Sequence, residues 1–150
     1  MSRVQLALNV SDIDEAIAFY TKLFGTVPAK VRPGYANFAI AEPPLKLVLI
    51  EGHGEPGSLN HLGVEVASAD DVDAAIRRLE EEGLADAVEQ NVSCCYARQD
   101  KVWADGPDGE PWEIYTVLGD VEMPVGQLRA TDAAGVACCQ PGTPSAERCC

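Results

Sequence analysis

The chain has 150 residues, which suits a single domain with one core, and its formal net charge is −13 at pH 7. This excess of negative charge argues against nucleic acid or an anionic membrane surface as a partner. The sequence shows no secretory signal pattern and no apolar run of about 18 residues, the length of a membrane-spanning helix. We therefore expect a cytoplasmic protein whose cysteines are reduced.

The first third of the chain predicts a strand, a helix and three further strands. Residues 4–10 alternate between two sets of side chains, as the two faces of a strand do. An N-cap signal at Asp12 precedes an amphipathic helix. This helix is expected to end at Gly25, because glycine tolerates the positive φ of a helix C-terminus. The three strands that complete this half are predicted at about 29–33, 35–41 and 43–51.

The second third of the chain repeats this order of elements. A strand over residues 60–66 leads to an amphipathic helix that begins after Ser68 and ends at Gly83. The three strands that follow are predicted at about 86–95, 98–105 and 109–117. A repeated strand–helix–strand–strand–strand unit indicates a duplication, so the two halves are expected to share one architecture.

The repeat also defines the predicted domain organisation. We expect one α+β domain over residues 1–119, with two tandem βαβββ modules at about 3–52 and 58–118. After Leu118 the composition shifts to Gly, Pro, Ala, Thr and Ser, which is typical of a flexible tail. This tail, residues 120–150, carries the cysteine pairs Cys138-Cys139 and Cys149-Cys150, for which the sequence indicates no role.

Alignment of the two halves places polar residues at matching positions. Gln5 aligns with His61 on the first strands, and Lys46 aligns with Glu113 on the last strands. Each residue has an ordinary structural interpretation, since a lone histidine on a strand is commonly a hydrogen-bonded structural residue. Glu113 would equally suit an exposed edge strand. The matching positions favour instead a shared site on one face of the sheet.

The duplicated pattern resembles the vicinal oxygen chelate superfamily, which includes glyoxalase I, extradiol dioxygenases and the bleomycin and fosfomycin resistance proteins. The resemblance covers about residues 3–118. It implies one curved, cupped mixed sheet around a divalent metal, with ligands from the first and last strands of each module. Carried over to this chain, it implies Gln5, His61 and Glu113 as ligands, because a protonated Lys46 cannot bind a metal. An amide, an imidazole and a carboxylate suit Fe(II) with open positions for O2 more than structural zinc.

All six cysteines occur as adjacent pairs, and one pair, Cys94-Cys95, lies within the predicted domain. Neighbouring Cα atoms are about 3.8 Å apart, below the roughly 4.4 Å that an unstrained disulfide needs. Two adjacent thiolates are able to bind one soft atom from the same side. The alternative is that both are small core residues, since buried free cysteine is common.

The stretch CCYARQDKVWADGPDGEPWEIYTV (94–117) looks like the organoarsenical carbon–arsenic lyases, which are non-haem iron dioxygenases of arsenic resistance, and the related cadmium-induced proteins. This resemblance implies Fe(II)- and O2-dependent cleavage of the carbon–arsenic bond of methylarsenite or trivalent aromatic arsenicals, giving arsenite. Cys94 and Cys95 would bind arsenic, whose single carbon bond leaves two exchangeable positions. Lys101 is a catalytic candidate that would stabilise developing negative charge, or else it is a surface ammonium.

Two alternatives stay open at this point. A non-catalytic, thiol-based arsenic- or cadmium-binding protein would need the cysteines but not the metal ligands. Another metal-dependent, glyoxalase-like enzyme of the superfamily would need the ligands but not the cysteines. Either a monomer or a homodimer fits, because two modules can complete one cup and the family often forms dimers.

Overall fold

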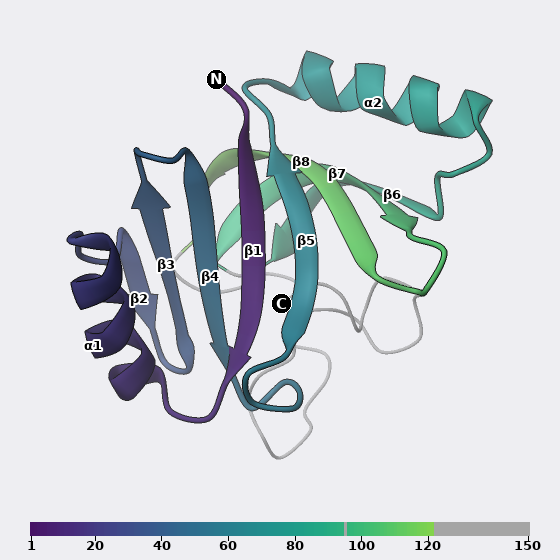
Figure 1. Cartoon of the computed structure of the whole chain (residues 1–150). Helices are drawn as coiled ribbons and strands as arrows, with labels where there is room; N and C mark the ends of the chain where they lie inside the picture. The colour runs from purple at the N-terminus through teal and green to yellow at the C-terminus, as the bar shows by residue number, and fades with distance from the viewer. Residues whose placement is uncertain (95, 122–150) are drawn as a thin grey trace. The chain divides into compact units, whose positions relative to one another are not determined.

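The computed structural model describes residues 1–94 and 96–121, in which the strand–helix–strand–strand–strand order occurs twice (Figure 1). The elements in chain order are β1 (Arg3–Val10), α1 (Ile13–Phe24), β2 (Lys30–Arg32), β3 (Tyr35–Ile40), β4 (Leu45–Glu51), β5 (Leu59–Glu65), α2 (Ala69–Glu81), β6 (Ala87–Cys94), β7 (Ala97–Asp105) and β8 (Pro111–Asp120). The α+β class and both predicted helices are therefore confirmed. The predicted tail lies outside the described residues from residue 122 onward.

Among the described residues, the contacts separate the chain into two compact units, residues 2–64 and the residues from 65 onward together with residue 1. The first unit contains β1 to β5 up to Val64, and the second contains α2 and β6 to β8. Neither helix in the described part of the chain is both long enough and apolar enough to cross a membrane.

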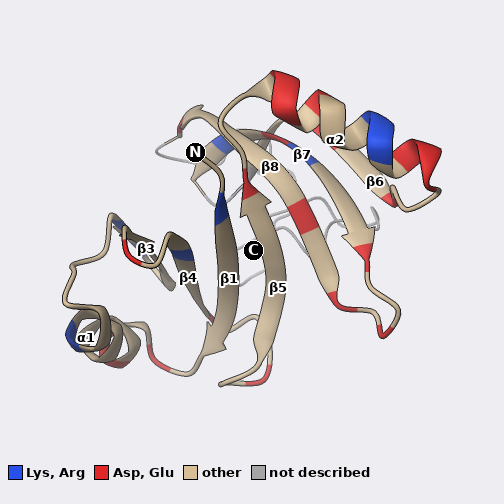
Figure 2. Ribbon diagram, turned by 45° about the horizontal axis from the view of Figure 1, so that its top comes forward, with Lys and Arg blue, Asp and Glu red and all other residues tan. Residues whose placement is uncertain are grey.

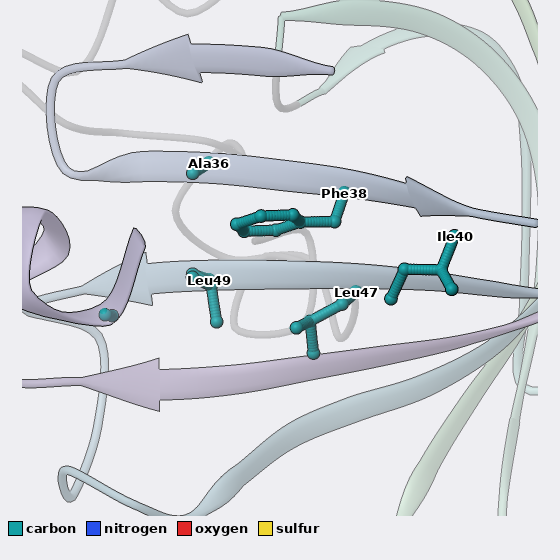
Figure 3. Packing of buried hydrophobic residues seen from close by; sticks show 6 residues of the cluster. Ala36, Phe38, Ile40, Leu47 and Leu49 are labelled. Atoms are coloured by element: carbon teal, nitrogen blue, oxygen red, sulfur yellow. The ribbon is translucent and has the colours of Figure 1, made fainter. Parts of the chain in front are cut away.

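The first unit is a sheet in the order β2-β3-β4-β1-β5, with α1 packed on one face. β1 runs parallel to β4, whereas β3 is antiparallel to β4 and to β2. Phe38 and Leu49 are fully buried in the core between sheet and helix, and Leu47 lies beside them (Figure 3). Because strand side chains alternate, this apolar face leaves Gln5 and Asn9 of β1 on the opposite face, where both are buried.

The second unit is built from β8, β7 and β6 in that order, all antiparallel, with α2 packed on one face. Val72 and Leu79 of α2 contact the core residue Val102 of β7. The exposed side of α2 is rich in acidic residues (Figure 2). Alternation along β7 places Gln99, Lys101 and Trp103 on the strand face opposite to Val102, and all three are buried.

Both helices begin at the N-caps that the sequence predicts. The Asp12 side chain accepts a hydrogen bond from the Glu15 backbone N–H, and the Ser68 side chain accepts one from the Asp71 backbone N–H. These bonds satisfy backbone donors that a helix cannot satisfy itself. The first helix ends at Gly25, which has φ 63°, and the second is followed by Gly83 with φ 68°.

Removal of the second N-cap is expected to give a moderate loss of stability. Ser68→Ala should lower the free energy of unfolding by about 1 kcal/mol, because the Asp71 N–H then lacks its partner. Urea unfolding followed by circular dichroism measures this change. Glu80→Gln, an exposed change at the other end of α2, is the control and should stay within about 0.5 kcal/mol of the parent. Equal stability of both variants would contradict the stabilising role of the Ser68 N-cap.

Candidate functional site

The buried polar face of the first unit brings Gln5 and His61 together. Gln5 lies on β1 and His61 on the neighbouring strand β5, and each is only 3% exposed. Gln5 Nε2 is 3.0 Å from His61 Nε2. On the other side of the ring, His61 Nδ1 is 2.7 Å from Asn60 Oδ1. We call Gln5, Asn9, Asn60 and His61 the β1–β5 cluster.

The β1–β5 cluster contains two residues that the sequence analysis missed, Asn9 and Asn60. Asn60 Nδ2 donates to Asn9 Oδ1 at 3.0 Å, so Asn9 holds the amide that contacts His61 Nδ1. A signal was present, because Asn9 shares a face with Gln5 in the strand pattern and Asn60 directly precedes His61. Lys46 of β4 is the strand partner of Gln5 of β1 and is 8% exposed, so Lys46 borders this polar face.

The buried polar face of the second unit centres on an ion pair between Lys101 and Glu113. Lys101 Nζ lies 2.9 Å from Glu113 Oε2, and neither side chain is more than 4% exposed. Trp103 is the strand partner of Glu113, and the Lys101 ammonium lies 5.3 Å from the centroid of its ring. This position allows a cation–π interaction. Tyr115, the strand partner of Lys101, is fully buried. We call Gln99, Lys101, Trp103, Glu113 and Tyr115 the β7–β8 cluster.

The ion pair changes the interpretation of Lys101. From the sequence, Lys101 is a candidate for stabilising charge during the reaction or else a surface ammonium, and at 1% exposure it is not on the surface. Its charge is matched by a carboxylate, as a buried charge requires. Gln99 is also buried, and its Oε1 has no hydrogen-bond partner among the described residues. It is therefore an acceptor that a bound molecule could satisfy.

One residue of the predicted thiol pair, Cys94, lies where β6 ends. Cys94 is the last residue of β6 and pairs with Ala97, the first residue of β7. Tyr96 has φ 64°, which is uncommon for a residue with a side chain and is typical of tight hairpin turns. Cys95 lies outside the described residues, as do the four cysteines of the tail, Cys138, Cys139, Cys149 and Cys150.

The residues predicted as metal ligands are chemically suited to a divalent metal. Donor atoms bound at about 2.1 Å and at right angles to each other lie about 3.0 Å apart. The Gln5 and His61 nitrogens have this separation, 3.0 Å. Rotation of the Gln5 amide would bring its carbonyl oxygen, the ligating atom, into the same position. Within the residues that are described, no three His, Cys, Asp or Glu side chains form a metal-binding group.

Known proteins resemble this chain over most of its length. A family model described as the Glyoxalase/Bleomycin resistance protein/Dioxygenase superfamily matches residues 3–114. The chain is 62% identical over 142 residues to the trivalent organoarsenical cleaving enzyme of Thermomonospora curvata, which covers 94% of this chain and 90% of that protein. It is 63% identical over 122 residues to the cadmium-induced protein CadI of Mycobacterium tuberculosis, covering 81% of this chain and 80% of that protein.

Solved structures show the same fold at lower identity. The Mn(II)-bound glyoxalase from Novosphingobium aromaticivorans matches with a TM-score of 0.58 and 22% identity, over 86% of this chain and 44% of that chain. At this identity the match shows the fold alone. The resemblances inferred from the sequence, to the superfamily and to organoarsenical-cleaving and cadmium-induced proteins, are confirmed.

Proposed function

Because the chain belongs to the Glyoxalase/Bleomycin resistance protein/Dioxygenase superfamily, we propose that it is a metal-dependent enzyme that cleaves the carbon–arsenic bond of trivalent organoarsenicals. The observation that carries the proposal is the 62% identity, over 94% of the chain, to a protein named for that cleavage. The buried amide, imidazole and carboxylate of Gln5, His61 and Glu113 are donors of the type that this chemistry needs.

In the proposed site, Gln5 Oε1, His61 Nε2 and the Glu113 carboxylate would hold Fe(II). When bound, Fe(II) would supply the electron-transfer chemistry that allows O2 to react. Cys94 and Cys95 bind the arsenic as thiolates, filling its two exchangeable positions and leaving the carbon substituent free. Lys101 keeps the carboxylate of Glu113 hydrogen-bonded and oriented. Binding of the arsenical by the two thiolates would make its cleavage effectively intramolecular, which is a large source of rate enhancement.

The proposed reaction balances without an external reductant when the substituent is a methyl group. Methylarsenite, CH3As(OH)2, and O2 give arsenite, As(OH)3, and formaldehyde. The carbon–arsenic bond, the O–O bond and one methyl C–H bond break; one oxygen atom bonds to arsenic and takes up the methyl proton, and the other bonds to carbon. The carbon loses four electrons, the two oxygen atoms gain them, and arsenic stays trivalent. The proposal therefore requires one formaldehyde for each arsenite, with one atom of O2 in each product.

The experiment that tests this function is an anaerobic reconstitution with Fe(II), followed by methylarsenite and then by air. Arsenic species and formaldehyde are separated and counted. We expect arsenite and formaldehyde in equal amounts, only when both Fe(II) and O2 are present. Arsenite that forms without O2, or methylarsenite that stays intact under every condition, would rule out the proposed reaction.

Variants of the hairpin cysteines separate substrate binding from chemistry. Cys94→Ser and Cys95→Ser each leave one thiolate for arsenic, so we expect KM for methylarsenite to rise by about tenfold or more, which is about 1.4 kcal/mol of binding. Steady-state kinetics measures this change. The double variant Cys138→Ser/Cys139→Ser, in the tail, is the matched control and should leave KM unchanged. Hairpin variants with the KM of the parent would favour a glyoxalase-like enzyme that does not use these thiols.

The 63% identity to a cadmium-induced protein supports a second candidate, a thiol-based binder of arsenic or cadmium without catalysis. Such a protein would bind methylarsenite but leave its carbon–arsenic bond intact even when both Fe(II) and O2 are supplied. It would also release the arsenical intact upon denaturation. The reconstitution therefore distinguishes this candidate from the enzyme.

A further inference from the structure

A continuous chain of hydrogen bonds runs from the connector between β4 and β5 to the ring of His61. The Ser58 hydroxyl donates to the Glu55 carbonyl oxygen at 2.6 Å, and Asn9 Nδ2 donates to Ser58 Oγ at 2.9 Å. Asn60 Nδ2 then donates to Asn9 Oδ1 at 3.0 Å. The chain ends at the 2.7 Å contact between Asn60 Oδ1 and His61 Nδ1. All of these residues belong to the first unit.

The direction of this chain is determined at its beginning. A carbonyl oxygen only accepts, so the Ser58 hydroxyl must give its proton to Glu55 and then accepts from the Asn9 amide. With its NH2 group used on Ser58, Asn9 presents its oxygen to Asn60. Asn60 in turn donates an N–H to Asn9, so its side-chain oxygen faces the imidazole of His61. An amide oxygen cannot donate, so the proton between Asn60 and His61 must lie on Nδ1.

Asn9 itself is held in place on three sides. Its backbone N–H donates to the Ser58 carbonyl oxygen at 2.9 Å, and its own carbonyl oxygen accepts from the Gly57 N–H at 2.8 Å. Its side-chain amide lies against Gly54, where an added Cβ would come within 2.5 Å of Asn9 Nδ2. The connector therefore needs a glycine at this position to admit the amide, and the hydrogen bonds to Ser58 and from Asn60 determine which way the amide faces.

We propose that Asn60, oriented by Asn9 and the connector, is a positioning residue that fixes His61 as the Nδ1–H tautomer. In this tautomer Nε2 carries a lone pair, and it is Nε2 that lies 3.0 Å from the Gln5 amide. Metal-binding histidines commonly donate their other ring N–H to an acceptor that fixes the tautomer. The metal part of this inference rests on the proposed function, whereas the tautomer itself is a property of the metal-free protein.

Nitrogen NMR of the metal-free protein tests the tautomer directly. The chain has two histidines, so His53→Gln, a change at an exposed position, leaves the ring of His61 as the single imidazole in the spectrum. At a pH at which imidazoles are neutral, we expect a protonated Nδ1 and an unprotonated Nε2. In the same background, Asn60→Leu, which keeps the size but removes the acceptor, should give a substantial fraction of Nε2–H. Asn60→Asp, which keeps an acceptor, should retain Nδ1–H.

Metal affinity provides the second measurement. Titration with Co(II), followed by its visible absorption, should show affinity about 10–100-fold weaker in Asn60→Leu and close to the parent in Asn60→Asp. Ser58→Ala, at the far end of the chain, is a milder variant that should shift the tautomer in the same direction by less. The backbone amide spectrum of each variant checks that the fold is kept.

The outcomes separate this inference from the proposed function. An Nε2–H tautomer in the parent, or a tautomer that Asn60→Leu and Ser58→Ala both leave unchanged in a folded protein, would overturn the inference. Loss of the tautomer in Asn60→Leu, together with a parent protein that never cleaves methylarsenite, would support the inference and overturn the proposed function alone.

Discussion

His61→Ala is expected to abolish measurable cleavage of methylarsenite and to weaken metal binding severely. His61 is 3% exposed and provides the one imidazole of the proposed ligand set. Loss of a residue that merely supports a metal ligand typically costs about 10–100-fold in affinity or activity. Removal of the ligand itself should therefore lower both metal affinity and activity by more than about 100-fold. The measurements are kcat with Fe(II) supplied in excess and the dissociation constant for Co(II).

The other histidine of the chain offers a matched control. His53 lies in the glycine-rich connector and is exposed. His53→Ala should therefore keep both kcat and metal affinity within about twofold of the parent, a difference of about 0.4 kcal/mol. Equal activity of His61→Ala and His53→Ala would refute the assigned ligand. Unchanged arsenical binding in an inactive His61→Ala variant is the expected result, because the thiols bind the substrate.

Lys101→Met is expected to cause the largest loss of stability among single charge removals in the described part of the second unit. The substitution leaves the Glu113 carboxylate buried and without the ammonium 2.9 Å away. Removing one partner of a buried pair typically costs about 3–5 kcal/mol, because the remaining charge is not compensated. Urea unfolding of the metal-free protein gives the free energy of unfolding that tests this value.

A double variant separates loss of the pair from loss of packing. In Lys101→Met/Glu113→Leu both charges are gone, so most of the stability lost in the single variant should return, since hydrophobic replacement of a buried pair is often neutral. Lys22→Met, at an exposed position of α1, is the control and should change stability by less than about 0.5 kcal/mol. A single variant as stable as this control would mean that Lys101 contributes no compensation to Glu113.

The sequence was sufficient to predict the architecture, because the signals that determine it are local. The capping residues Asp12 and Ser68 and the terminal glycines define both helices, and alternation assigns Gln5 to one face of the first strand. The strand ends were less accurate. The last strand begins at Pro111 rather than at 109, because residues 106–110 form a turn that a Gly109-to-Gly106 backbone bond closes at 2.9 Å.

The side-chain partnerships could not be predicted, because they depend on register and on three-dimensional proximity. Alternation shows that Lys101 and Glu113 lie on polar faces, but only the observed pairing of Trp103 with Glu113 brings the ammonium beside the carboxylate. The partner of Asn60 was equally unpredictable. Asn60 directly precedes His61 in the sequence, but its hydrogen bond to Asn9 depends on the adjacency of β1 and β5.

The two polar clusters differ in how far apart along the chain their members lie, and this has a kinetic consequence. Gln5 and His61 are separated by 56 residues, whereas Lys101 and Glu113 are separated by 12. Closing the longer loop costs about 1.4 kcal/mol more conformational entropy on a logarithmic dependence on length. During folding, the ion pair is therefore expected to form early with its local hairpin, and the imidazole and amide should meet late. Nascent chains would acquire the capacity to hold a metal only after most of the sheet has assembled.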